Sequence, residues 1–189
     1  AKGALNLLDE DERKRIKLVD TKTLGIVQAL YVIRTAELLQ INNHFKGVEK
    51  TVTYLMEQGT NAFTVDSLKW LKKSDRISTL GALVGDLIDI KPYIAVTNSV
   101  LSLVGKSRGK MNLLDKIADR ATDAFKKNKG EYDLWIAHCD AKKDAIYLTE
   151  KLADGFNRAV KTIKIIKTKP SISIKIGPGG ITFGMFKKI

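Results

Sequence analysis

The chain has 189 residues and a formal net charge of +12, with 44% apolar and 29% charged residues. This composition is typical of a soluble globular protein of one large or two small domains and argues against disorder. No apolar stretch approaches the roughly 18 residues that cross a bilayer, so no integral membrane segment is expected. The acidic run Asp9–Glu12 is unlike a secretory signal. A single cysteine, Cys139, excludes an internal disulfide and favours the cytoplasm.

The first third of the chain has mainly helical patterns. We expect a helix over residues 4–13 and a short strand over residues 16–19, followed by N-cap chemistry at Asp20–Thr23. From Leu24 to Ile41 the residues are apolar nearly all round, which predicts a helix that is buried on every side. A second helix follows, and its apolar face contains Phe45, Val48, Val52, Leu55 and Met56.

After Gly59 the patterns of strands and helices alternate. The expected strands cover residues 62–65, 90–96, 100–104, 133–137, 162–166, 172–176 and 181–186, and the expected helices cover residues 67–73, 79–89, 110–127 and 141–156. Such alternation predicts a mixed α/β class, with a mixed, partly antiparallel sheet flanked by helices.

Residues suited to catalysis are few. His138 and Cys139 are neighbours in an expected strand, where adjacent side chains point to opposite faces and cannot form a nucleophile–base pair. The two histidines and the cysteine have no zinc-ligand spacing. No Walker loop, Gly-x-Ser-x-Gly elbow or dinucleotide-binding fingerprint is present. We therefore expect neither an enzyme nor a cofactor.

The glycine-rich turn Gly177–Gly180 is the clearest candidate binding feature. Successive backbone N–H groups in such a turn can form a nest for an anion. Lys175 approaches the turn from the strand face opposite the isoleucines, which predicts a site for a carboxylate or phosphate. The competing interpretation is a plain tight turn. Arg76 and Arg108 stand alone beside apolar segments, and by themselves each favours a surface or helix-end charge.

The chain after Asp154 contains no acidic residue. Its eight basic residues should attract anions or acidic partners. A basic nucleic-acid-binding or other anion-binding module is therefore the alternative function, and a lysine-rich solvated face explains the charges equally well. This tail has one arginine and three phenylalanines at core-like spacing, which argues against stacking on nucleic acid.

Taken in order, short motifs along the chain resemble those of the DegV family. Residues 66–78, DSLKWLKKSDRIS, are similar to the family's DSLEYLRKGGRIS stretch. Residues 105–108 are similar to its GKVR segment and residues 136–141 to its IAHGDA segment. Three shorter matches are VDTKT at residues 19–23 for IDSKS, IKP at residues 90–92, and the terminal GPG turn at residues 177–179. Their shared order carries the resemblance, because each motif is short.

The resemblance implies a carrier that holds one long-chain fatty acid in a tunnel between two domains and presents its carboxylate to a fatty-acid kinase. It implies that residues 1–60 are the remainder of a first α/β domain with connecting helices, and that residues 61–189 are the second domain. The ligand-binding residues expected on this basis are Lys175, Gly177, Gly179 and Arg76, and the partner-binding residues are Arg108 and Lys106.

The two arginines are expected to have different roles. Arg76, between two helical segments, should be held by backbone carbonyls or a carboxylate and should organise the fold near the tunnel. Arg108, in a lysine-rich loop, should be exposed and available to an acidic partner.

Two departures from the family pattern bear on these expectations. The family's hydroxyl-bearing segments that hold the carboxylate lie upstream of Ala1, so the chain is expected to be a fragment. Many relatives have histidine two residues before the GPG turn, where this chain has Lys175. Lysine keeps a charge for the carboxylate but does not exchange a proton easily near neutral pH. Binding is therefore better supported than the kinase partnership.

Overall fold

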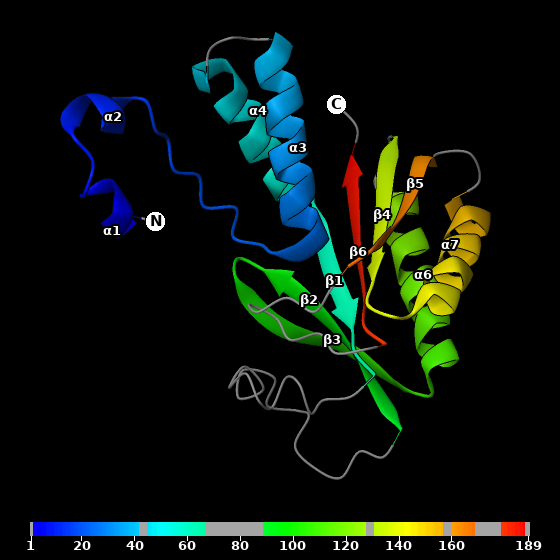
Figure 1. The fold of residues 1–189 in the computed structure, drawn as a ribbon. Helices are drawn as coiled ribbons and strands as arrows, with labels where there is room; N and C mark the ends of the chain where they lie inside the picture. Colours follow the sequence, from blue (N-terminus) through cyan, green and yellow to red (C-terminus); the bar gives the residue numbers. More distant parts are fainter. Residues whose placement is uncertain are drawn as a thin grey trace.

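The computed structural model describes residues 2–41, 45–66, 89–127, 131–156, 160–168 and 179–187, which build a sheet between layers of helices (Figure 1). The helices are α1 (Lys2–Leu5), α2 (Glu10–Lys14), α3 (Gly25–Ile41), α4 (Phe45–Gln58), α6 (Lys110–Lys127) and α7 (Lys142–Phe156). The strands are β1 (Thr60–Thr64), β2 (Ile90–Thr97), β3 (Val100–Arg108), β4 (Tyr132–His138), β5 (Val160–Lys167) and β6 (Ile181–Lys187). The helices expected over residues 67–73 and 79–89 and the strand expected over residues 172–176 fall outside these ranges, apart from Asp89, which lies in a turn.

The strands form one sheet in the order β3-β2-β1-β6-β4-β5. β4 and β5 are parallel, and every other neighbouring pair is antiparallel. The carboxyl ends of β1, β4 and β5 therefore lie along one edge of the sheet, which we call the carboxyl edge. The starts of β2 and β6 and the end of β3 lie on the same edge. The predicted mixed, partly antiparallel sheet flanked by helices is confirmed.

Helices cover both faces of the sheet, as alternate residues of β4 demonstrate. Leu134 and Ile136 belong to the core that includes α6 and α7, whereas Trp135 and Ala137 pack with α3. Successive side chains of a strand point to opposite faces, so the two helix layers lie on opposite sides of the sheet (Figure 1). All seven residues of β4 are buried, as expected for a central strand that is covered twice.

Helix α6 has the predicted limits. Leu114, Ile117 and Ala121 recur on one helical face and are buried against the sheet and α7, whose Leu148 and Leu152 are fully buried. Fully burying each of these leucines or the isoleucine contributes roughly 1.5–3 kcal/mol. This packing fixes the start of α6 at the carboxyl edge.

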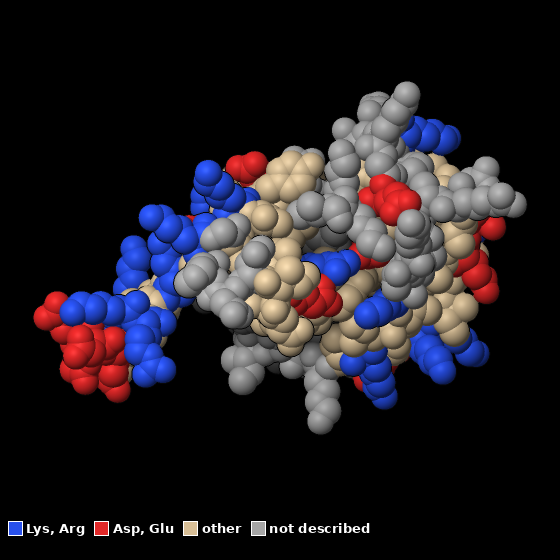
Figure 2. Space-filling view, turned by 90° about the horizontal axis from the view of Figure 1, so that it is seen from above, with Lys and Arg blue, Asp and Glu red and all other residues tan. Residues whose placement is uncertain are grey.

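The chain before α3 differs from the prediction. The single helix expected over residues 4–13 is divided into α1 and α2, because Asp9 caps α2 by accepting a hydrogen bond from the N–H of Glu12 at 2.8 Å. The expected strand over residues 16–19 is also wrong. These residues make no ladder with any described strand, and a strand requires a partner for its backbone groups. In Figure 2 the acidic side chains of this N-terminal arm gather at its tip.

Helix α3 is not buried on every side. Its inner face contributes Ile26, Val27 and Leu30 to the core beneath it, whereas Val32 is 62% exposed and Ile41 is 78% exposed. The exposed residues point away from the sheet, and no described element covers them. None of the helices in the described part of the chain combines the length and apolarity needed to cross a membrane.

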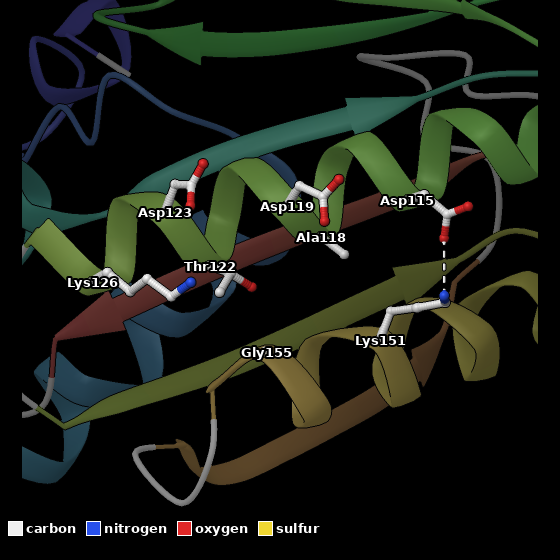
Figure 3. A pocket seen from close by; sticks show the side chains of 8 residues that line it. All are labelled: Asp115, Ala118, Asp119, Thr122, Asp123, Lys126, Lys151 and Gly155. Atoms are coloured by element: carbon white, nitrogen blue, oxygen red, sulfur yellow. Dashed lines mark ion pairs between the residues drawn. The ribbon is translucent and has the colours of Figure 1, made fainter.

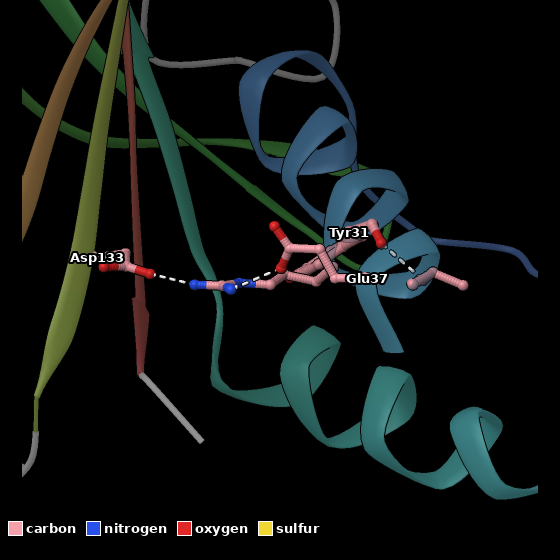
Figure 4. Close-up of polar contacts among 5 residues, drawn as sticks. Tyr31, Glu37 and Asp133 are labelled. Carbon is pink, nitrogen blue, oxygen red and sulfur yellow. Dashed lines mark hydrogen bonds and ion pairs between the residues drawn. The ribbon is translucent and has the colours of Figure 1, made fainter. Parts of the chain in front are cut away.

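A partly buried ion pair joins α3 to β4 (Figure 4). Arg34 donates one hydrogen bond to Asp133 at 2.5 Å and another to Glu37 at 2.7 Å. Burial by itself would lower the pKa of Arg34, but the hydrogen bonds to both carboxylates raise that pKa above its ordinary value. Arg34 is therefore charged, and it compensates Asp133, which is only 5% exposed.

Candidate functional site

The described end of the glycine turn lies in the middle of the carboxyl edge, because β6 lies between β1 and β4. Gly179 has a φ of +89°, a conformation that favours glycine. Its N–H donates to the carbonyl of Cys139 at 2.8 Å, and the N–H of Cys139 donates to the carbonyl of Gly180 at 2.9 Å. These two bonds attach the turn to the end of β4. Since the N–H of Gly179 already has an acceptor, this residue contributes the shape of the turn.

Lys110, at the start of α6, binds the same turn from the other side. Its ammonium group donates to the carbonyl of Gly179 at 2.7 Å. It also pairs with Asp66, just after β1, at 2.9 Å, and with Asp144, in the first turn of α7, at 2.6 Å. The Lys110 side chain is only 16% exposed. One lysine therefore joins β1, α7 and the glycine turn.

The predicted partner-binding residues Lys106 and Arg108 lie at the same edge. They are exposed and belong to the last residues of β3, so the loop expected for Arg108 is wrong. Lys106 pairs with Pro92 of β2, and Arg108 pairs with Ile90. Paired residues in an antiparallel ladder lie on the same face of the sheet. Residues two apart along a strand also lie on one face, so Ile90, Pro92 and Ile94 of β2 share a face. Lys106 and Arg108 therefore lie on the face that also carries Ile94.

That face of β1, β2 and β3 is apolar. It is opposite the face that packs against α6. Ala62 of β1 and Tyr93 of β2 belong to the core that includes α6, and the next residue along each strand, Phe63 and Ile94, points to the other face. Its buried residues are Phe63, Val65, Ile94, Val96 and Leu101, with Leu24 and Leu103 packed against them. We call this set the apolar face. It ends at the carboxyl edge beside Lys106 and Arg108.

The end of β4 offers no nucleophile in an activated state. Burial raises the pKa of the Cys139 thiol, Asp140 raises it further, and Lys167 partly opposes them. A buried thiol with a raised pKa is a poor nucleophile near neutral pH. His138 is 4% exposed, and its Nδ1 accepts the N–H of Ala141 at 3.4 Å. Both side chains contribute to the packing of the edge.

Two surface hollows lined by described residues lie elsewhere, and polar residues make up much of both linings. The first, of about 550 Å³, lies between α6 and α7 and has a mainly charged lining (Figure 3). It is lined by Asp115, Ala118, Asp119, Thr122, Asp123, Lys126, Lys151 and Gly155. The second, of about 500 Å³, lies beside the start of α3 and β1 and has a mixed lining of five threonines, two asparagines, Lys22 and Glu57 with apolar residues such as Met56 and Val96. Burying methylene groups against such polar linings would leave charged or hydrogen-bonding groups without water.

Of the six predicted site residues, three lie in the described part of the chain, and the fold brings them to one edge: Gly179, Lys106 and Arg108. The others fall outside the described ranges, and their roles stay predictions: Arg76, Lys175 and Gly177.

Sequence reasoning missed the three charged residues that meet at the turn. Asp66 is interpretable from sequence only as a helix cap, and Lys110 and Asp144 look like ordinary residues of a first helical turn. The three are far apart in the chain, so no local spacing indicates that they meet. The sequence offers one signal. Asp66 follows a strand, and Lys110 and Asp144 lie in the first turns of helices, at the end of an α/β sheet where ligands commonly bind.

The fold defines a class: an α/β protein in which the described strands form one mixed sheet of six between two helix layers. Solved structures share it. A fatty acid binding DegV family protein from Streptococcus agalactiae is 25% identical, with a TM-score of 0.77 over 92% of this chain and 60% of that one. A DegV family protein from Eubacterium eligens loaded with heptadecanoic acid is 19% identical, with a TM-score of 0.79 over 98% of this chain and 66% of that one.

The sequence comparisons lead to the same group. A DegV domain-containing protein of Clostridium perfringens is 30% identical over 79% of this chain and 52% of its own length. One from Deinococcus radiodurans is 27% identical over 80% of this chain and 54% of its own length. The profile of the DegV family, described as uncharacterised proteins, matches residues 1–188. The chain belongs to the DegV family, and it spans about half the length of these two relatives.

Proposed function

We propose that this chain is part of a fatty-acid carrier, which holds a long-chain fatty acid along the apolar face and its carboxylate at the carboxyl edge. The observation that carries the proposal is that the apolar face ends at the same edge of the sheet as the glycine turn, where Gly179 lies. An acyl chain removed from water there gains about 0.8 kcal/mol per CH₂ group. A cationic side chain, the role expected of Lys175, favours a carboxylate head. Relatives described as fatty-acid-binding support the same ligand class.

The proposal has three further parts. Residues 1–60 are the remainder of a first domain and residues 61–189 the second, with the tunnel between them. The carrier is not itself an enzyme, and a fatty-acid kinase is its partner. Its location is the cytoplasm, which the single cysteine favours. The nucleic-acid alternative has no specific observation in its favour among the described residues. One lysine of the basic tail, Lys164, already contacts an aromatic ring of this chain, because its ammonium group lies 4.8 Å from the ring centre of Trp135.

Native mass spectrometry of the purified full-length protein tests the carrier proposal. We expect a bound mass equal to that of a long-chain fatty acid, released on denaturation and displaced by an added fatty acid of another length. A fluorescent long-chain fatty acid should compete for the same site. Absence of both the bound mass and the competition would reject the carrier function.

Lys175→Ala is expected to weaken fatty-acid binding. The loss of one charge-assisted hydrogen bond to the carboxylate, worth roughly 1.5–3 kcal/mol, lowers affinity by about 10- to 150-fold. Lys175→His should restore part of the affinity, because an imidazole can still donate to the carboxylate. Titration with a fluorescent fatty acid measures both. Lys50→Ala, on the exposed surface of α4, is the control. Equal affinities of Lys175→Ala and wild type would place the head-group site elsewhere.

Arg108→Glu is expected to separate binding from phosphorylation. Arg108 is exposed at the end of β3, so its reversal should leave the fatty-acid affinity within about threefold while it repels an acidic partner surface. Acyl-phosphate formation with the kinase and direct fatty-acid titration measure the two effects. Lys50→Glu is the charge-matched control. If both activities fall together, or neither falls, Arg108 is not the partner-binding residue.

A further inference from the structure

Lys110 has no free donor for a ligand. An ammonium group has three N–H donors, and Lys110 has three acceptors within 3 Å: Asp66, Asp144 and the carbonyl of Gly179. A residue with its donors fully used cannot bind a carboxylate directly without breaking one of these contacts. Its effect on a ligand at the glycine turn must therefore pass through the groups that it holds.

The contact between Asp66 and Gly179 shows what Lys110 holds in place. A Cβ atom on Gly179 would lie only 2.8 Å from the Cβ of Asp66, so the backbone of the turn rests directly on this aspartate. Lys110 binds the carboxylate of Asp66 and the carbonyl of Gly179 together. A second lysine, Lys91, donates to the backbone carbonyl of Asp66 at 2.8 Å and leaves its carboxylate to Lys110. Lys110 thus links Asp66, just after β1, to the backbone of the turn.

The charges at this point give Lys110 a second effect. One ammonium group lies between two carboxylates, those of Asp66 and Asp144. Without the ammonium group, neither carboxylate would have an ion-pair partner among the described residues, and two negative charges would face the turn. An arriving carboxylate would then be repelled, and an uncharged head group would not.

We propose that Lys110 is a positioning residue for the carboxylate of the fatty acid: it sets the glycine turn on Asp66 and offsets one of the two negative charges of the acidic pair beside it. This proposal rests on the carrier function proposed above. It predicts a selective effect, in which loss of Lys110 weakens the binding of acids more than the binding of uncharged lipids of the same length.

The test compares a fluorescent long-chain fatty acid with the fatty alcohol of equal length, the latter measured by displacement, in the full-length protein. Lys110→Met should weaken the acid by about tenfold or more and the alcohol by less than about threefold. Lys110→Arg, which keeps the charge, should recover most of the acid affinity. Lys116→Met, on the exposed side of α6, is the control and should bind both ligands as the wild type does.

Each result separates the two proposals. Equal weakening of acid and alcohol by Lys110→Met would make Lys110 only a structural residue, and unchanged affinity for both would also overturn the positioning role. If Lys110→Met does not fold, Asp144→Asn and Lys110→Arg decide the question by the same acid-to-alcohol ratio. A wild-type protein that binds neither ligand would instead reject the carrier function itself.

Discussion

Gly179→Ala is expected to lower the free energy of unfolding by roughly 2–5 kcal/mol, from about 1–2 kcal/mol for the positive φ and about 1–3 kcal/mol for the collision with Asp66. The carboxylate of Asp66 cannot simply rotate away, because Lys110 holds it and because even its Cβ would be too close. Where the variant still folds, the displaced turn should bind a fatty acid at least about tenfold more weakly.

Two other glycines separate the cost of the positive φ from the cost of the collision with Asp66. Gly25 has a φ of +66°, but nothing lies within 4 Å of the position that a Cβ atom would take, so Gly25→Ala should cost only the backbone part, about 1–2 kcal/mol. Gly105 has the same open space and no positive φ, and Gly105→Ala in β3 should not destabilise the fold. Urea denaturation of the three variants measures the differences. A Gly179→Ala variant no less stable than Gly25→Ala would show that the turn does not rest on Asp66.

Arg34→Met should destabilise the protein by about 3 kcal/mol. Removing one partner of a buried ion pair typically costs about 3–5 kcal/mol, because the remaining charge has no compensation. Asp133 is that remaining charge, and its side chain is 7% exposed. We place the expected loss at the lower end because the Arg34 side chain is 34% exposed and water can partly replace it.

The partners of Arg34 provide the controls for guanidinium denaturation. Glu37 is 51% exposed, so Glu37→Gln should cost less than about 1 kcal/mol. The double variant Arg34→Met with Asp133→Leu removes both charges and should recover much of the lost stability. A double variant as unstable as Arg34→Met alone would mean that lost packing, and not the unpaired carboxylate, causes the effect.

Local patterns were sufficient for much of the fold. Helix α6 has the predicted limits because its apolar spacing and its many Lys, Leu and Ala residues, which are good helix formers, act within the helix itself. The predicted strand after the Asn98-Ser99 turn stops at Val104, whereas β3 continues to Arg108. Its last residues carry no apolar alternation, and pairing with β2 across a register shift between Tyr93 and Ile94 extends the strand instead.

What could not be predicted depends on partners distant in the chain. The apolar run over residues 16–19 has strand-forming residues but no described strand beside it, so propensity alone does not make a ladder. The candidate site has the same character. Gly179 is recognisable from its motif, but the lysine that holds it, Lys110, is an ordinary first-turn residue until the sheet brings Asp66 and Asp144 to it. Side-chain ion pairs between remote segments leave no periodic signal.

The central position of β6 has a consequence for the synthesis of the protein. β6 is the last of the described strands to leave the ribosome, yet it alone joins the unit of β1, β2 and β3 to the unit of β4 and β5. Until residues 181–187 emerge, β1 and β4 each have an open hydrogen-bonding side, and such sides readily pair with other chains. Closing the sheet requires contacts between residues far apart in sequence, which form slowly. We therefore expect the nascent chain to be prone to aggregation until β6 emerges, and a stop codon between residues 168 and 180 would leave two half-sheets that no described strand unites.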